Sequence, residues 1–230
     1  MQWKIKKATY KQADLTLVVA SNWMKDRINR SPLMSHLPCH LIPFGIDLKV
    51  FKPLSKIECR KKLGIPLNHR IIAFRGISSE KSSKMSQYKG ITYLIEALKI
   101  YDPKTPTVLL IFENGNDFKI FSPKYSLMTM GWVDGNDLVT ALSAADIFLM
   151  PSVQESFGLM AVEAMACGTP VIVFEGTSLP DVIKAPLGGL AVPNKDSTAL
   201  AKAIKQLMED DEMRTKIGMQ ARLIAEREYS

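Results

Sequence analysis

Two glutamates lie eight positions apart in a segment that joins two strongly apolar runs, residues 146–150 and 170–174. Glu155 precedes a predicted helix that begins near Ser156 or Phe157, and Glu163 lies within that helix, about 10 Å further along at ~1.5 Å per residue. Carboxylates accept pairs of hydrogen bonds from vicinal hydroxyls, which sugars and riboses supply. The spacing therefore predicts that the two glutamates bind two parts of one long, hydroxyl-rich ligand.

The start of the predicted helix supplies donors for the same ligand. The backbone N–H groups of Phe157, Gly158 and Leu159 have no acceptor within the helix, and they favour a diphosphate or a sugar oxygen. Gly158 lets such a ligand approach the backbone closely. We therefore expect residues 156–159, including Ser156, to line a binding site.

Each glutamate also has a simpler explanation. Glu155 would favour the helix dipole by ~0.3–1 kcal/mol, and Glu163 would be an ordinary surface residue. However, the neighbours of Glu163 in the sequence are all apolar: Met160, Ala161, Val162, Ala164, Met165 and Ala166. A charge in so apolar a helix normally needs a partner or a ligand, which favours the binding interpretation.

Apolar runs alternate with helical patterns along residues 55–230. The pattern predicts strands at 70–75, 107–113, 127–131, 146–150, 170–174 and 189–192. It predicts helices at 55–63, 90–100, 136–144 and 157–167, a helical turn near 179–183, and two C-terminal helices. Continuous apolar strands such as IIAF and VLLIF are typical of a sheet buried on both faces. The sequence therefore predicts an α/β fold with a doubly wound parallel sheet, which binds ligands beyond the carboxyl ends of its strands.

The first part of the chain has a different organisation. A predicted strand at 15–20 leads into a helix that begins at Ser21 or Asn22 and ends before Ser31-Pro32. A second strand at 39–43 leads into a stretch with one glycine and two prolines, which predicts a bend or hinge. We place a domain boundary there and divide the chain into residues 1–46 and 47–230.

Composition excludes several classes of protein. The chain has 230 residues, of which 47% are hydrophobic and 23% charged, as in soluble globular proteins. No apolar stretch approaches the ~20 residues of a membrane span, and no secretory signal is recognisable. Three widely spaced cysteines without a CxxC pair suggest neither disulfides nor a zinc site and fit a reducing cytosol. The motifs GxGxxG, GxxxxGK[ST], GxSxG and HExxH are absent, which argues against dehydrogenases, P-loop NTPases, serine hydrolases and zincins.

The formal net charge of +7 is concentrated near the N-terminus. Residues 1–64 carry 13 Lys and Arg against 4 Asp and Glu, whereas residues 65–230 carry 17 against 19. No aromatic platform accompanies the lysines, so we expect no nucleic-acid partner. The basic region permits peripheral contact with the anionic inner face of a membrane, although a solvated face or a protein contact explains it as well. We expect a cytoplasmic protein.

The run PSVQESFGLMAVEAMACGTPVIV (151–173) resembles the E-x7-E signature of retaining GT-B glycosyltransferases, specifically those of glycosyltransferase family 4. Other segments follow the order of that family. The segment IPFGID (42–47) is similar to its interdomain linker, and RKKLGIP (60–66) is similar to the start of its nucleotide-sugar domain. GWV (131–133) and PS (151–152) also match, so the resemblance covers nearly the whole chain.

The resemblance implies a Rossmann-like C-terminal half of a GT-B fold. Residues 1–46 would be the end of the acceptor-side domain with the linker, and residues 47–230 the donor-binding domain. In such a domain Glu155 would bind hydroxyls of the donor sugar, Glu163 the ribose, and the Phe157–Leu159 amides the sugar and diphosphate. Arg75 and Lys89 would bind the diphosphate. Fourteen positions separate those two residues, so Lys81 or Lys84 is an alternative.

The activity implied by the resemblance is the retaining transfer of a hexose from a nucleotide-diphosphate sugar to a glycan or lipid-linked acceptor. Such reactions build polysaccharides or lipopolysaccharides. Arg75, Lys89 and the helix N-terminus would stabilise the leaving diphosphate, so no metal or other cofactor is expected. Because most of the acceptor-side domain is missing, a truncated, non-catalytic nucleotide-sugar binding module is an alternative. A GT-B nucleotide-sugar epimerase is a further one.

Overall fold

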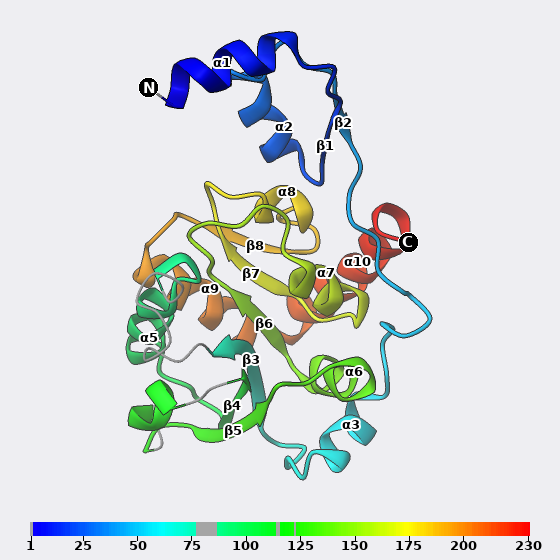
Figure 1. The fold of residues 1–230 in the computed structure, drawn as a ribbon. Coiled ribbons are helices and arrows are strands. Elements are labelled where there is room, and N and C mark those ends of the chain that lie inside the picture. The colour runs from blue at the N-terminus through cyan, green and yellow to red at the C-terminus, as the bar shows by residue number, and fades with distance from the viewer. Residues whose placement is uncertain (1, 77–86, 114–115, 122) are drawn as a thin grey trace.

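The computed structural model describes residues 2–76, 87–113, 116–121 and 123–230, and its main part is a parallel sheet between two layers of helices (Figure 1). In the described residues, six strands form this sheet in the order β5-β4-β3-β6-β7-β8. The strands are β3 (Arg70–Gly76), β4 (Thr107–Glu113), β5 (Ser126–Gly131), β6 (Ile147–Met150), β7 (Val171–Phe174) and β8 (Gly189–Val192). The predicted doubly wound α/β fold is confirmed.

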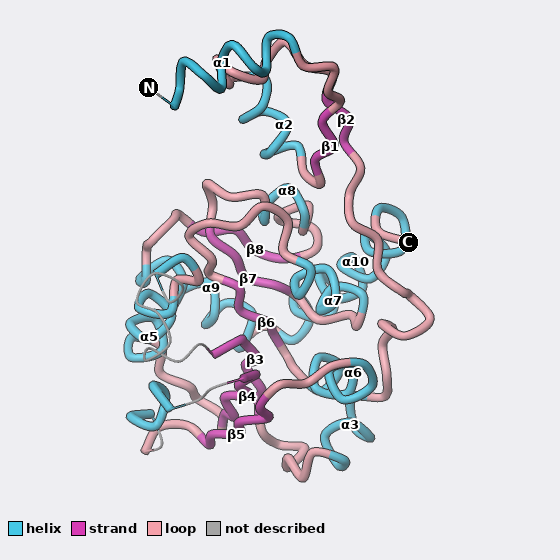
Figure 2. The backbone as a smooth tube through the Cα atoms, in the orientation of Figure 1, coloured by secondary structure: helices cyan, strands magenta, loops and turns pink. Residues whose placement is uncertain are grey.

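Helices cover both faces of the sheet (Figure 2). One face packs against α5 (Ile91–Ile100), α9 (Ser197–Glu209) and the 3-10 helix η1 (Asn116–Phe121). The other packs against α3 (Lys56–Lys62), α6 (Gly135–Ala144), α7 (Leu159–Ala166) and α10 (Asp211–Glu228), while the short α8 (Leu179–Val182) follows β7. Ile72 and Phe74 of β3 join the first core, and Ile71 and Ala73 join the second, because successive strand residues point to opposite faces.

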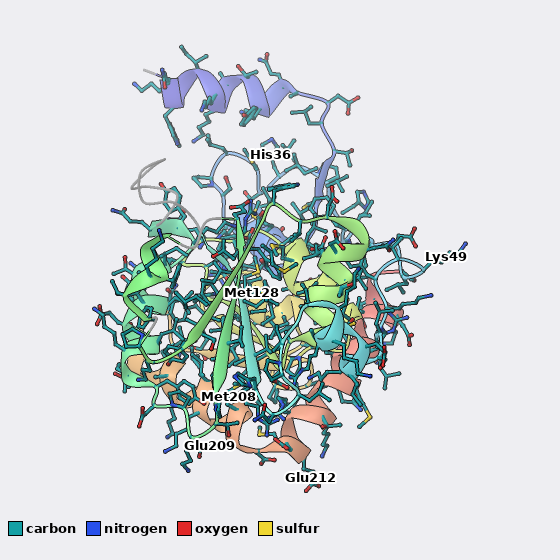
Figure 3. The ribbon with its side chains drawn as sticks, turned by 90° about the horizontal axis from the view of Figure 1, so that it is seen from below. His36, Lys49, Met128, Met208, Glu209 and Glu212 are labelled. Atoms are coloured by element: carbon teal, nitrogen blue, oxygen red, sulfur yellow. The ribbon has the colours of Figure 1, made fainter. Side chains whose placement is uncertain are left out.

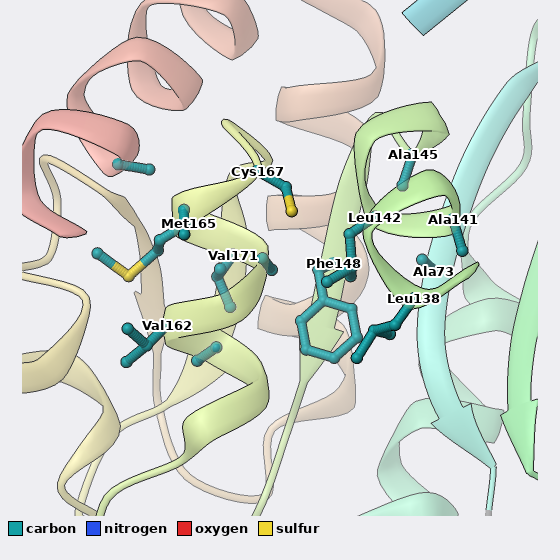
Figure 4. Packing of buried hydrophobic residues seen from close by; sticks show 14 of the residues in the cluster. Ala73, Leu138, Ala141, Leu142, Ala145, Phe148, Val162, Met165, Cys167 and Val171 are labelled. Atoms are coloured by element: carbon teal, nitrogen blue, oxygen red, sulfur yellow. The ribbon is translucent and has the colours of Figure 1, made fainter. Parts of the chain in front are cut away.

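The helix that carries Glu163 is packed tightly into the second core. In Figure 4, Phe148 of β6 lies close to Leu138 and Leu142 of α6, and Val162 and Met165 project from α7 in the same buried cluster. Five of the eight residues of α7 are buried. This packing fixes the position of the N-terminus of α7 relative to the sheet.

A buried charge cluster holds α3 against the start of β6. Asp146 accepts hydrogen bonds from Arg60 (2.8 Å), Lys56 (3.0 Å) and the Ile71 N–H (2.8 Å). Burial alone would raise the pKa of Asp146, but the two cations and the Ile71 N–H together hold it below its usual value. The cluster therefore joins the first helix after the linker to two central strands.

Residues 2–41 lie outside the six-stranded sheet (Figure 1). They form α1 (Gln2–Gln12), β1 (Leu17–Val19), α2 (Asn22–Asn29) and β2 (Cys39–Leu41), with β1 and β2 paired in parallel. The sequence did not predict α1, which buries no residue. In Figure 3, His36 of this segment lies near α1 in the upper part of the view, and Glu212 of α10 lies at the lower edge.

The connection between the two parts runs along the C-terminus. The Ile46 N–H donates to the Tyr229 carbonyl at 2.9 Å.

Across the described ranges, no helix is both long enough and apolar enough to span a bilayer.

Candidate functional site

The candidate site lies where the sheet changes direction of winding. From β3 the chain adds strands toward β5, and it then returns to place β6 on the other side of β3. In open α/β sheets, ligands bind at such a switch point, beyond the carboxyl ends of the strands. Arg75 is the second-last residue of β3 and the 151–158 loop follows β6, so these two predicted segments flank the switch point.

The helix after this loop begins later than the sequence predicted. α7 starts at Leu159 rather than near Ser156 or Phe157, because Gly158 adopts a left-handed conformation with φ +96°. The left-handed turn favours glycine at Gly158, and a Cβ there would also force the Leu179 side chain to shift. Among the described residues, no backbone carbonyl accepts a hydrogen bond from the N–H groups of residues 157–160. These groups therefore have no backbone acceptor in the described part of the chain, and ligand binding by residues 157–159 stays a prediction.

A cavity of about 250 Å³ opens at this point. Its lining includes seven of the eight predicted site residues, namely Arg75, Lys89, Glu155, Ser156, Phe157, Gly158 and Leu159. The structure thus brings Arg75 and Lys89 to one site despite their wide spacing in the sequence. Lys81 and Lys84, the predicted alternatives, lie outside the described residues.

The eighth predicted residue, Glu163, lines a second cavity of about 330 Å³, together with Glu113 and Trp132. Arg75, Leu159 and Met160 line both cavities, so the two adjoin. Glu155 and Glu163 therefore line neighbouring cavities. Arg75 and the N-terminus of α7 lie between these cavities.

Lys89 and Glu155 form an ion pair in the first cavity. Lys89 Nζ lies 2.7 Å from Glu155 Oε2, and the two side chains are 27% and 15% exposed. The other carboxylate oxygen, Oε1, accepts from the Ser156 N–H at 3.2 Å. The carboxylate is thus fixed toward the cavity with lone pairs left for hydroxyl donors.

Glu163 has a different environment. Burial raises its pKa and the guanidinium of Arg75 opposes that rise, so the carboxyl is less acidic than an ordinary glutamate. No described residue donates a hydrogen bond to its side chain. A partly buried carboxylate to which no described residue donates is suited to accept hydrogen bonds from a ligand.

The N-terminal segment contacts the rim of the first cavity. Ser21 Oγ donates to the Ser156 carbonyl at 2.8 Å, and Trp23 Nε1 donates to the Gly176 carbonyl at 3.1 Å. Phe44 lines the cavity, and its ring meets that of Phe157 edge to face with centroids 5.1 Å apart. Residues from both parts of the chain therefore build the site.

The sequence assigned no role to three of these side chains: Phe44, Glu113 and Trp132. Glu113 and Trp132 nevertheless stand at the carboxyl ends of predicted strands, where a doubly wound sheet is expected to bind ligands. Phe44 had no such signal, because it lies in the predicted linker. The described side chains include no group of three or more His, Cys, Asp and Glu residues that would hold a metal ion.

Comparison with known proteins identifies the family. Residues 56–224 match the family described as Glycosyl transferases group 1. The chain belongs to this family. It is 31% identical over 201 residues to the D-inositol 3-phosphate glycosyltransferase of Saccharomonospora viridis, an alignment that covers 80% of this chain and 45% of that protein. The chain thus spans about half the length of this curated relative.

Solved glycosyl transferase structures share the fold. Sucrose-phosphate synthase from Thermosynechococcus elongatus matches with a TM-score of 0.82 and 26% identity, over 99% of this chain and 57% of that one. HepE from Anabaena, in complex with UDP-glucose, matches with a TM-score of 0.77 and 19% identity, over 99% of this chain and 63% of that one. The six-stranded sheet and its helices are therefore the Rossmann-like domain of a GT-B glycosyltransferase.

Proposed function

We propose that this chain is the donor-binding part of a retaining, family 4 glycosyltransferase that transfers a hexose from a nucleotide-diphosphate sugar to a glycan or lipid-linked acceptor. The observation that supports this most strongly is the placement of Glu155 and Glu163 in adjoining cavities that share Arg75 and the N-terminus of α7. The UDP-glucose complex of HepE, which has the same fold, supports a nucleotide-sugar donor.

Each compartment suits one part of such a donor. In this proposal Glu155 accepts hydrogen bonds from hydroxyls of the hexose in the first cavity. Glu163 accepts them from the ribose in the second, where its burial leaves little competition from water. The diphosphate then lies between them, near Arg75 and the free N–H groups of residues 157–160.

The chemistry proposed for this site is electrostatic. As the bond between hexose and diphosphate breaks, negative charge develops on the leaving phosphate oxygen. Lys89, Arg75 and the N-terminus of α7 stabilise that charge without a metal ion. Attack by the acceptor on the face from which the diphosphate leaves would retain the anomeric configuration.

We further propose that residues 1–46 end an acceptor-side domain and residues 47–230 form the donor domain. The separate β1–β2 pair supports this division, as does the start of the family match at residue 56. The acceptor would then bind on the side of the N-terminal segment. The four lysines of α1, which has no acidic residue, would favour contact with an anionic membrane surface in the cytoplasm.

A binding panel tests donor recognition. The chain is titrated by calorimetry with UDP, GDP, ADP and their common hexose conjugates. We expect saturable binding of one nucleotide class, weakened in Glu163→Ala and unchanged in Glu96→Ala, whose side chain is exposed and pairs with Lys99. A folded chain that binds none of these compounds would contradict the proposal.

An activity assay then separates a transferase from the alternatives. The chain is incubated with the donor it binds and with glycan or lipid-linked acceptors, and the product is analysed by NMR. A product with retained anomeric configuration would show that the chain itself carries out the proposed transfer, and an inverted product would contradict the retaining mechanism. Binding without transfer would favour a non-catalytic module, and release of an epimerised sugar without acceptor would favour an epimerase.

A further inference from the structure

Glu113, the last residue of β4, adopts a backbone conformation that disfavours its side chain. Its φ of +68° lies in the left-handed region that glycine tolerates best. The register between β4 and β5 also shifts here, so that Phe112 and Glu113 both lie opposite Gly131. Non-glycine residues in such conformations cluster at functional sites, where the surrounding structure maintains them.

The side chain of Glu113 pairs with a predicted site residue. Its Oε1 forms an ion pair with the NH2 group of Arg75, and both residues line the second cavity. Arg75 Cζ also lies 5.6 Å from the centroid of the Trp132 ring, within range of a cation–π interaction. Arg75, Glu113 and Trp132 stand at the ends of the neighbouring strands β3, β4 and β5. The guanidinium therefore interacts with two side chains, one at the end of β4 and one just after β5.

The position of the guanidinium matters because Arg75 lines both cavities. An unrestrained arginine would lose rotamer freedom when a ligand binds, and that ordering reduces affinity. A carboxylate that holds one NH2 group leaves the other guanidinium N–H groups available, since arginine has five donors. An arginine ordered in this way before binding loses less entropy when it contacts an anion.

We propose that Glu113 is a positioning residue that holds Arg75 at the junction of the two cavities, ready to bind the diphosphate of the donor. This inference rests on the proposed function, because it assigns the diphosphate to that junction. Although Glu113 also lines the second cavity, its Oε1 is engaged by Arg75, and in this proposal it acts through that arginine. Its contribution is to affinity for the diphosphate and not for the nucleoside or the hexose.

The test uses Glu113→Gly, because glycine suits a φ of +68° and removes the carboxylate without imposing new strain. The chain and the variant are titrated with UDP, GDP and ADP and with the corresponding nucleosides, and their thermal stability is compared. We expect about tenfold weaker binding of the diphosphate, unchanged binding of the nucleoside and an unchanged or higher Tm. Glu96→Gly is the control for charge, and it leaves binding unchanged because Glu96 is exposed on α5.

A double-mutant cycle shows whether the effect acts through Arg75. In the Arg75→Ala background, Glu113→Gly should cause no further loss of affinity for the diphosphate. Equal or tighter diphosphate binding by Glu113→Gly alone would overturn the inference, since the carboxylate would then compete with the ligand. An equal loss of nucleoside affinity would also overturn it, because it would indicate a structural role. If the unaltered chain binds none of the diphosphates, the proposed function itself fails.

Discussion

Lys89 Nζ lies 2.7 Å from Glu155 Oε2, and this ion pair joins the turn before α5 to the loop before α7. The two residues are 66 positions apart in the chain. In the proposed site, Glu155 binds the hexose and Lys89 the adjoining diphosphate. Each charged group therefore orients the other while both keep capacity for the ligand.

Lys89→Ala should weaken the binding of nucleoside diphosphates by about tenfold to a hundredfold. The loss follows from removing one charge-assisted hydrogen bond, for which ~1.5–3 kcal/mol is typical. Calorimetric titration measures it, with Lys99→Ala as the control because Lys99 forms an exposed pair on α5. An unchanged Kd in a folded Lys89→Ala variant would remove Lys89 from the site.

Gly90→Ala should destabilise the protein by about 2 kcal/mol or more. Gly90 has φ +70°, and a Cβ there would lie 1.9 Å from the Pro151 carbonyl oxygen, so the backbone beside Lys89 would have to move. Urea unfolding measures the effect. Gly64→Ala is a matched control, because Gly64 has φ +68° with nothing within 4 Å of an added Cβ. Equal destabilisation by the two variants would show that the contact with Pro151 is not limiting.

Asp146→Asn should reduce the free energy of unfolding by about 3–5 kcal/mol, because it leaves the buried Arg60 without its charged partner. The matched control is Asp137→Asn, whose exposed pair with Lys62 contributes about 0–1 kcal/mol. The lowered pKa of Asp146 also predicts a pH dependence. Its stabilising contribution is complete above the pKa of an unfolded aspartate and is lost as pH falls through the lower, folded pKa. Equal unfolding midpoints in urea for the two variants would contradict the role of the cluster.

Glu163→Gln should stabilise the folded protein at neutral pH while it impairs nucleotide binding. The pKa of Glu163 is raised in the folded state, so the folded state binds the proton more tightly than the unfolded state. The free energy of unfolding therefore falls as pH rises through the unfolded and then the folded pKa of Glu163. Glutamine does not titrate, so the variant avoids this decrease. We expect a Tm about 2 °C higher at pH 7 and no difference at low pH, where the glutamate is protonated. A lower Tm at pH 7 would show that the carboxylate has a stabilising partner.

The sequence predicted the strands and most helices because the apolar pattern of each element lies within its own residues. Runs such as Ile71–Phe74 and Val171–Phe174 are apolar throughout, as a sheet covered on both faces requires. The start of α7 was missed by two or three residues, because Gly158 adopts a left-handed conformation that the apolar pattern of the sequence does not reveal. α1 was missed because it buries no residue and so has no apolar face to detect.

The residue types of the candidate site were predictable from the sequence, but the contacts between those residues were not. Glu155 and Glu163 were recognisable from their spacing and their apolar surroundings. The order of the strands, which brings Arg75 beside the 151–158 loop, depends on long-range contacts that no local pattern encodes. For the same reason the sequence did not identify Glu113 as the partner of Arg75. That ion pair depends on β3 lying beside β4, with Gly76 opposite Glu113.

Donor binding by the two glutamates is tested most directly by titrating the chain, Glu155→Ala and Glu163→Ala with a nucleotide sugar and with its free nucleoside diphosphate. We predict that Glu163→Ala weakens both ligands by at least about tenfold, since each contains the ribose. Glu155→Ala should weaken the nucleotide sugar more than the free diphosphate, because the free diphosphate has no hexose. Unchanged affinities in both folded variants would contradict the assignment, as would an equal loss of both ligands in Glu155→Ala.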